Sequence, residues 1–145
     1  MREGERRGMV DEGSDQTPGL LLDTNIVIAV LKQEDAALAR LKETAGSVFV
    51  SVITLGELRF GARKSGRVEE NLQRVEDFAA ESNILPCDEE TSRRYGEVKD
   101  GLRRKGRPIP DNDLWISATA TQRGLVLVTR DSHFEHVEGL RVERW

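Results

Sequence analysis

The sequence predicts an α/β fold in which a central parallel β-sheet is flanked by helices. Short apolar runs, such as residues 19–23, 47–53 and 125–131, alternate with segments of helical periodicity. These runs are largely apolar throughout instead of alternating with polar residues, which is typical of parallel strands buried on both faces. Strands that alternate with helices along a chain indicate the same class. At 145 residues the chain is long enough for one domain with a substantial core.

The first half of the chain predicts two strands and four helices. The continuous leucine run at 19–23 predicts the first strand, and apolar periodicity predicts helices at 26–33 and at 35–46, the second ended by Gly46. The β-branched run at 47–53 predicts the next strand. Apolar residues at three- and four-residue spacing then predict two more helices, at residues 54–65 and 67–82.

The second half repeats the alternation with shorter strands. A charged segment with one apolar line predicts a long helix, and the glycine at position 124 closes the helix after it. The expected elements are a strand at 84–87, a helix at 88–106, a break at 107–110, a helix at 111–124, a strand at 125–131, a turn or short helix at 133–140 and a strand at 141–145.

Residues 1–18 are charged and glycine-rich and contain no apolar segment, which predicts a disordered lead-in before a domain at 19–145. Met9 within this segment is an alternative start. No signal peptide and no membrane span is expected, so we expect a cytoplasmic protein without membrane contact. The single cysteine, Cys87, excludes an internal disulfide, and its apolar neighbours favour a place in the core. The net charge of −4 argues against a general nucleic-acid binder.

Four acidic residues occupy comparable positions along the chain: Asp23, Glu57, Asp113 and Asp131. Asp23 and Asp131 come at the carboxyl ends of predicted strands, and the other two stand near the starts of predicted helices. Because the carboxyl ends of parallel strands form one edge, where ligand sites occur, we expect the four carboxylates to converge there.

Each acid also has a purely structural explanation. Asp23 and Asp131 are suited to capping the helix or turn that follows them. The segment 54–57 fits a capping box, in which the glutamate satisfies a backbone N–H group. Asp111 is suited to an N-cap, with Asp113 in the first helical turn.

Four carboxylates at close range would repel one another and raise one another's pKa values. The stretches around the first three acids contain no lysine or arginine placed to neutralise them. A hard divalent cation would do so, and oxygen ligands indicate Mg²⁺, with Mn²⁺ as the alternative, rather than zinc. Such a site suits phosphodiester hydrolysis, in one-ion or two-ion form. The two histidines, His133 and His136, are interpreted as surface and packing residues rather than as catalytic groups.

The segments LLDTNIVI, VSVITLGELRFGA, IPDNDLWISATA and LVLVTRDSHF resemble, in this order, the four acidic motifs of PIN domains, and most closely those of VapC-type toxins. The resemblance runs from Gly19 to the C-terminus. It implies a PIN-like fold and a Mg²⁺-dependent endoribonuclease that acts as the toxin of a VapBC-type toxin–antitoxin pair. The family's metal-binding acids correspond to Asp23, Glu57, Asp113 and Asp131, and Asp111 remains open as a residue that shares the third role. Polar residues expected to orient these ligands are Asn25, Asn112 and Thr129.

The resemblance also implies an RNA substrate, a VapB-like antitoxin that covers the acidic groove, and a homodimer. Local positive charge attracts a polyanion even on an acidic protein. The expected RNA-backbone contacts are the basic residues before the third motif, Arg104, Lys105 and Arg107. The expected dimer contacts are apolar residues of two adjacent helices, Leu55, Phe60 and the stretch 68–75.

Three other functions remain as alternatives. A phosphatase with Asp23 as nucleophile would need an aspartate at position 25, where Asn25 stands. A catalytically inactive PIN-like binding module would be expected to lack some of the acids, and all four are present. A housekeeping RNA-processing PIN nuclease would share the site, and only the short single-domain length favours the toxin over it.

Overall fold

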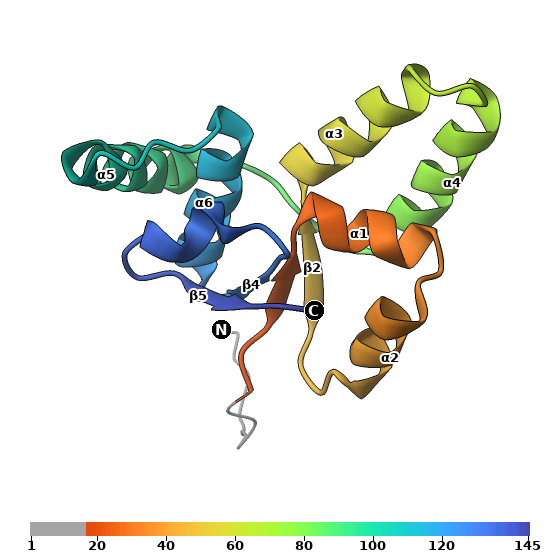
Figure 1. Cartoon of the computed structure of the whole chain (residues 1–145), viewed down its shortest axis with the longest axis horizontal. Helices are drawn as coiled ribbons and strands as arrows, with labels where there is room; N and C mark the ends of the chain where they lie inside the picture. The colour runs from red at the N-terminus through yellow and green to blue at the C-terminus, as the bar shows by residue number, and fades with distance from the viewer. Residues whose placement is uncertain (1–16) are drawn as a thin grey trace.

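The structure is a computed structural model that describes residues 17–145, and it confirms the predicted parallel sheet flanked by helices (Figure 1). Apart from residues 17 and 18, the segment predicted to be disordered lies outside the described residues, as does Met9. The elements are β1 (Leu20–Leu22), α1 (Thr24–Leu31), α2 (Asp35–Glu43), β2 (Val48–Ser51), α3 (Val52–Arg63), α4 (Val68–Ala80), β3 (Asn83–Leu85), α5 (Glu89–Lys105), α6 (Asp111–Arg123), β4 (Val126–Val128), the 3₁₀ helix η2 (Ser132–His136) and β5 (Arg141–Glu143).

The five strands are parallel and are ordered β3-β2-β1-β4-β5. The chain moves outward from β1 through β2 to β3, and it then returns to the other side of β1 to form β4 and β5. In an open α/β sheet, such a reversal of direction leaves a crevice at the carboxyl ends of the central strands. Leu22 pairs with Val128 at these ends, so the residues that follow β1 and β4 emerge side by side.

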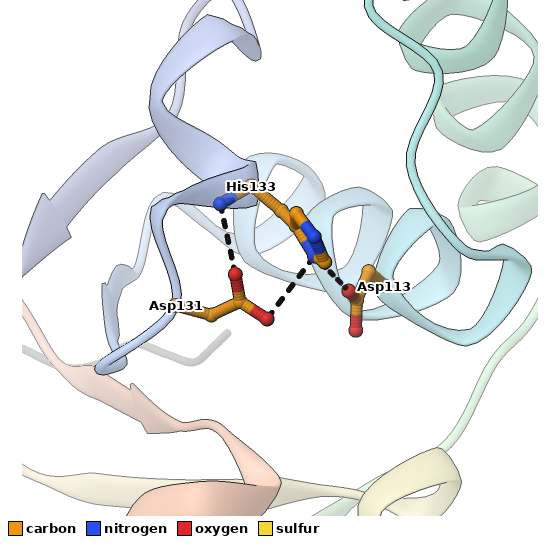
Figure 2. Close-up of side chains that lie close together, drawn as sticks. All are labelled: Asp113, Asp131 and His133. Carbon is orange, nitrogen blue, oxygen red and sulfur yellow. Dashed lines mark hydrogen bonds and ion pairs between the residues drawn. The ribbon is translucent and has the colours of Figure 1, made fainter.

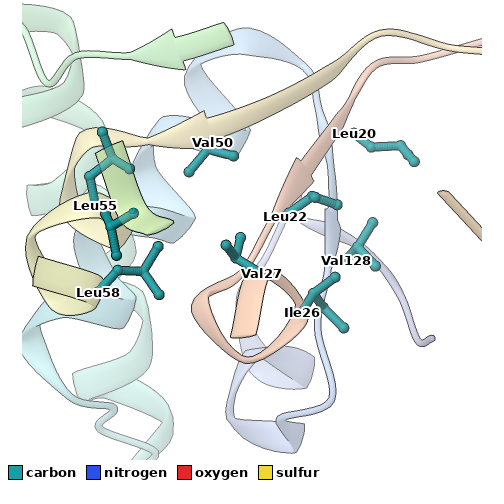
Figure 3. Close-up of a cluster of buried hydrophobic side chains, with 9 residues drawn as sticks. Leu20, Leu22, Ile26, Val27, Val50, Leu55, Leu58 and Val128 are labelled. Carbon is teal, nitrogen blue, oxygen red and sulfur yellow. The ribbon is translucent and has the colours of Figure 1, made fainter. Parts of the chain in front are cut away.

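Both faces of the sheet are covered, as the continuous apolar runs predict. Leu20, Leu22 and Val128 pack on one face against α1, α3 and α4 (Figure 3). Leu21 and Leu127 point to the opposite face, where they pack against α6 and η2. Helix α5 packs on the outer side of α6 (Figure 1). Alternate side chains of a strand point to opposite faces, so a strand buried on both sides must be apolar at every position.

The strand predicted at 47–53 is shorter than expected, because helix α3 begins at Val52. The Ser51 hydroxyl accepts a hydrogen bond from the Ile53 backbone N–H at 3.0 Å and so caps this helix. The capping-box interpretation of 54–57 is therefore wrong, since Thr54 lies inside the helix. The Glu57 side chain is thus left free for contacts outside its own helix.

Other local predictions also need correction. Helix α2 ends at Glu43, before Gly46. A Cβ atom on Gly46 would lie 2.7 Å from the Pro18 carbonyl oxygen, so the glycine serves the close approach of two backbone segments. Pro110 takes the N-cap position of α6, which leaves Asp111 as the first helical residue. Cys87 is only partly buried and is not a core residue.

The C-terminal ends of α5 and α6 agree with their sequence signals. Gly106 and Gly124 both adopt the left-handed conformation, with φ values of 69° and 65°. Glycine adopts this conformation without a Cβ clash and ends the helix there. None of the helices within residues 17–145 has both the length and the apolarity needed to cross a membrane.

Two fully buried serines are expected to affect stability in opposite directions. Ser117 Oγ has no hydrogen-bond partner among the described residues, whereas Ser51 Oγ caps α3. Ser117→Ala should raise the free energy of unfolding by about 1 kcal/mol, because an unpaired buried hydroxyl is removed. Ser51→Ala should lower it by roughly 1 kcal/mol. Chemical denaturation of the three proteins measures both changes, and a destabilised Ser117→Ala would show that its hydroxyl has a partner.

Candidate active site

Asp23 lies at the carboxyl end of β1 and is almost completely buried, with 4% of its surface exposed. Its Oδ1 accepts a hydrogen bond from the Thr24 backbone N–H at 2.8 Å and caps α1. Its Oδ2 accepts a hydrogen bond from the Thr129 hydroxyl, which follows β4, at 2.7 Å. Burial raises the Asp23 pKa, the two hydrogen bonds oppose the rise, and the nearby charges of Glu57 and Asp131 add to it.

Glu57 extends from α3 toward the same edge of the sheet. The Thr24 hydroxyl donates a hydrogen bond to Glu57 Oε1. The Asn112 side-chain amide donates another to Glu57 Oε2 at 3.2 Å. Both carboxylate oxygens are thereby oriented by residues from other helices, α1 and α6.

Asp113 and Asp131 approach each other on either side of the His133 ring (Figure 2). His133 Nδ1 lies 3.3 Å from Asp113 Oδ2 and 3.1 Å from Asp131 Oδ2. Asp131 also caps η2, because its Oδ1 accepts a hydrogen bond from the His133 backbone N–H at 2.9 Å.

The Asp113 pKa is raised from its ordinary value of 3.8 to about 6. Burial is the main cause, since only 16% of this side chain is exposed. The contact with His133 lowers the pKa, and the negative charges of Asp23, Asp131 and Glu57 raise it. The other three acids therefore lie close enough for their charges to affect the pKa of Asp113.

The four acids belong to one closed set of contacts. The Thr129 hydroxyl contacts both the Asp23 carboxylate and the Asp131 backbone N–H, and His133 contacts both Asp131 and Asp113. Asn112, the sequence neighbour of Asp113, donates to Glu57. Glu57 also accepts from Thr24, the sequence neighbour of Asp23, which closes the set. The members come from the carboxyl ends of β1 and β4 and from α1, α3, α6 and η2. The sheet edge and the surrounding helices thus converge on one acidic centre.

Two further polar residues differ in where their side chains point. Asn25 Nδ2 lies 3.4 Å from Asp23 Oδ2 and 3.4 Å from Thr129 Oγ1. The side-chain oxygen of Asn25, Oδ1, accepts a hydrogen bond from the Arg130 backbone N–H at 3.2 Å. Asn25 therefore belongs to the acidic centre. The Asp111 carboxylate instead accepts a hydrogen bond from Tyr95 of α5, which directs it away from the other acids.

The basic residues before α6 are mostly engaged with other groups. Arg104 forms an ion pair with Asp100 at 3.3 Å. Lys105 donates a hydrogen bond to the His136 carbonyl oxygen at 2.8 Å. The exposed Arg107 side chain forms no ion pair with any described residue, so it is the one of the three that is free to meet a substrate.

The donor set of the centre fits a divalent metal. In the part of the chain that the structure describes, no lysine or arginine forms an ion pair with Asp23, Glu57, Asp113 or Asp131. Potential ligand atoms of Asp113, Asp131 and His133 all lie within 4.8 Å of one another. Crowded carboxylates without a basic partner would be stabilised by a cation.

His133 is exposed, as its interpretation as a surface residue predicts. Its ring also lies between two carboxylates of the centre, a contact that the sequence did not predict. The sequence contains one usable signal: His133 follows Asp131 by two residues in a short turn, where the aspartate caps the histidine N–H group. His136 does not join this cluster, so the motif His-x-x-His has no common role.

The chain is similar to known proteins over most of its length. The family model described as "PIN domain" matches residues 20–140. The chain is 40% identical over 127 residues to Ribonuclease VapC2 of Haemophilus influenzae, covering 86% of this chain and 96% of the relative. It is 38% identical over 127 residues to the tRNA(fMet)-specific endonuclease VapC of Shigella flexneri, again covering 86% and 96%.

Solved structures show the same architecture. The structure of DNA-bound VapBC from Salmonella typhimurium matches with a TM-score of 0.83 and 35% identity, covering 89% of this chain and 99% of that chain. VapBC2 from Rickettsia felis, bound to a DNA fragment from its promoter, matches with a TM-score of 0.82 and 29% identity, covering 88% and 98%.

The raised pKa of Asp113 predicts a pH dependence of the metal-free protein. Between about pH 4 and 6 the folded state holds the Asp113 proton more tightly than the unfolded state does, so stability falls as pH rises through this window. Above it, the unfavourable charge costs at most about 3 kcal/mol. Asp113→Asn should therefore gain stability over the wild type as pH rises from 4.5 to 7.5.

Urea denaturation in EDTA at the two pH values measures this difference. Asp111→Asn is the matched control, since its carboxylate lies against Tyr95. An Asp113→Asn gain that is equal at both pH values would contradict the raised pKa of Asp113.

Proposed function

Because the chain belongs to the PIN domain family, we propose that it is a divalent-metal-dependent endoribonuclease and the toxin of a VapBC-type toxin–antitoxin pair. The observation that carries the proposal is the closed set of contacts that holds Asp23, Glu57, Asp113 and Asp131 at one edge of the sheet. The ribonuclease names of the curated relatives and the toxin–antitoxin complexes among the similar structures support it.

PIN-domain nucleases generally depend on divalent metals, and the carboxylates of this chain form a suitable donor set. We infer that the four acids hold Mg²⁺, with Mn²⁺ as the alternative, because hard cations prefer oxygen ligands. When bound, such an ion lowers the pKa of a water molecule and stabilises the charge that develops on a phosphodiester. Because the four acids are distributed around the closed set of contacts, the site has room for one ion or two.

The residues around the acids position them for this task. Thr129 and the Thr24 backbone N–H hold the two oxygens of Asp23, and Asn112 and the Thr24 hydroxyl hold those of Glu57. Partners of this kind fix the direction of a metal ligand and strengthen its binding. Preorganised ligands need not rotate when an RNA phosphate arrives, which keeps the reorganisation cost low.

We propose that the RNA backbone reaches the site past the segment that precedes α6. Arg107 is the strongest candidate contact because its charge has no carboxylate partner in the described chain. Arg104 and Lys105 contribute less to RNA binding, because Arg104 must first leave Asp100 and Lys105 must first leave the His136 carbonyl oxygen. A few local cations attract RNA even though the net charge of the chain is −4.

The proposed partners are RNA, a VapB-like antitoxin and a second copy of the chain. Two of the expected dimer contacts are wrong, because Leu55 and Val75 are buried in the core, with 4% and 3% of their surfaces exposed. Phe60 stays a candidate, since it is 65% exposed on α3 and lies on one face of that helix with the partly exposed Val52. Exposed apolar side chains that share one face favour contact with another chain.

Two alternative functions differ in what they require. An inactive binding module would not need all four acids to be held in one set of contacts. A housekeeping RNA-processing nuclease would share the site but would have no antitoxin that binds it and blocks its activity. A small gene next to this one, with a product that binds this chain and blocks cleavage, distinguishes the toxin from such a nuclease.

The metal-nuclease proposal is tested by Asp23→Asn. The asparagine keeps the cap of α1, so melting should be unchanged or occur at a higher temperature. RNA cleavage should fall by more than the roughly 10- to 100-fold loss that follows removal of an outer partner of a metal ligand. Asp111→Asn, a neighbouring acid directed to Tyr95, should retain activity. Wild-type cleavage that persists in EDTA, or an active Asp23→Asn, would disprove the proposal.

The dimer proposal is tested by Phe60→Asp. The exposed position should tolerate the change, so the melting temperature should stay within a few degrees, while the charge should weaken an apolar interface. Sedimentation velocity at micromolar concentration should show a dimer for the wild type and a monomer for the variant. A monomeric wild type would count against a homodimer, and a dimeric variant would place the interface elsewhere.

A further inference from the structure

His133 places a ring nitrogen at the point where two carboxylates of the acidic centre meet. Its Nδ1 lies 3.1 Å from Asp131 Oδ2 and 3.3 Å from Asp113 Oδ2. Nδ1 carries at most one hydrogen, so it cannot donate a full hydrogen bond to both oxygens at once. One nitrogen and two carboxylate oxygens thus lie close together, and a single hydrogen on the nitrogen can satisfy only one of the two oxygens fully.

The same three atoms have the spacing of a metal-binding group. Ligand atoms that each lie about 2.1 Å from one ion are separated by roughly 3 to 4 Å. The two distances from His133 Nδ1 fall in this range, and all three ligand atoms lie within 4.8 Å. The His133 side chain is 48% exposed, so an ion reaches the ring from solvent without opening the core.

We propose that His133 is a nitrogen ligand of the metal site, together with Asp113 and Asp131, and that it biases this position toward first-row transition metals over Mg²⁺. Imidazole nitrogen suits ions such as Zn²⁺, Fe²⁺ and Ni²⁺, whereas Mg²⁺ prefers oxygen ligands and retains its water. The inference rests on the proposed metal-dependent function. In this proposal the nitrogen ligand lies beside Asp113 and Asp131, away from the contact between Thr24 and Glu57.

The selectivity of the site follows from the mixed donor set. For a given site with nitrogen and oxygen ligands, Co²⁺ binds more tightly than Mn²⁺. Replacing the imidazole by an amide leaves oxygen donors, which suit Mg²⁺ as well as before. Loss of His133 should therefore reduce the affinity for Co²⁺ far more than the affinity for Mg²⁺.

Direct metal binding tests this assignment without measuring RNA cleavage. The chain contains two histidines, so tag-free His133→Asn and His136→Asn are a matched pair. Calorimetry should show Co²⁺ affinity falling about 10-fold or more for His133→Asn, with Mg²⁺ affinity changing less than about 2-fold. His136→Asn should match the wild type for both ions.

Pulsed electron paramagnetic resonance of bound Mn²⁺ gives a second readout. Nitrogen modulation should be present in the wild type and in His136→Asn and absent in His133→Asn. If Mn²⁺ binds the wild type without nitrogen modulation, or if Co²⁺ affinity is unchanged in His133→Asn, the His133 ligand is disproved while the metal-dependent nuclease stands. If neither Mn²⁺, Co²⁺ nor Mg²⁺ binds the wild type, the proposed metal dependence fails with it.

Discussion

The parallel pairing of β1 with β4 is the constraint on which the acidic centre depends. Leu22 pairs with Val128, and the Asp23 backbone N–H donates to the Val128 carbonyl oxygen at 2.9 Å. This register brings the Thr129 hydroxyl to the Asp23 carboxylate. Without that hydrogen bond, a carboxylate with 4% of its surface exposed would lose a main compensation for its burial. The strand pairing therefore makes a buried, oriented aspartate possible at the centre of the edge.

Glu57, Asp113 and Asp131 lie around Asp23, and the repulsion between the four carboxylates is unfavourable. Burial and mutual repulsion raise the pKa values of Asp23 and Asp113. The described chain compensates with threonine, asparagine and histidine contacts and with no lysine or arginine. The threonine and asparagine donors orient the carboxylates but leave their negative charge in place. The metal-free protein thus retains a charge excess that favours cation binding, and this links the stability of the fold to the function proposed for it.

In two of the acids, a structural role coincides with the metal-binding role proposed above. Asp23 caps α1 with one oxygen and contacts Thr129 with the other. Asp131 caps η2 with one oxygen and faces His133 with the other. A carboxylate has enough lone pairs for both tasks, so a cap does not exclude a ligand. Glu57 differs, because Ser51 caps α3 and leaves the glutamate without a capping role.

The sequence by itself determined the features that depend on local patterns. Continuous apolar runs predicted strands buried on both faces, and Gly124 predicted the end of α6. The places of the four acids at strand ends and helix starts predicted a common edge. These signals are local because side-chain periodicity and helix capping involve residues only a few positions apart. The burial of Leu55 and Val75 was not readable in this way, since an apolar residue on a helix does not show which neighbour covers it.

Only the tertiary structure decided which distant residues meet. His133 contacts Asp113 across 20 positions, and Thr24 contacts Glu57 across 33. Asp111 and Asp113 are near neighbours in one helix, yet one turns to Tyr95 and the other to the acidic centre. The physical reason is that these contacts depend on how α6, η2 and α3 pack around the sheet edge, and this packing follows from the whole core and from no single segment.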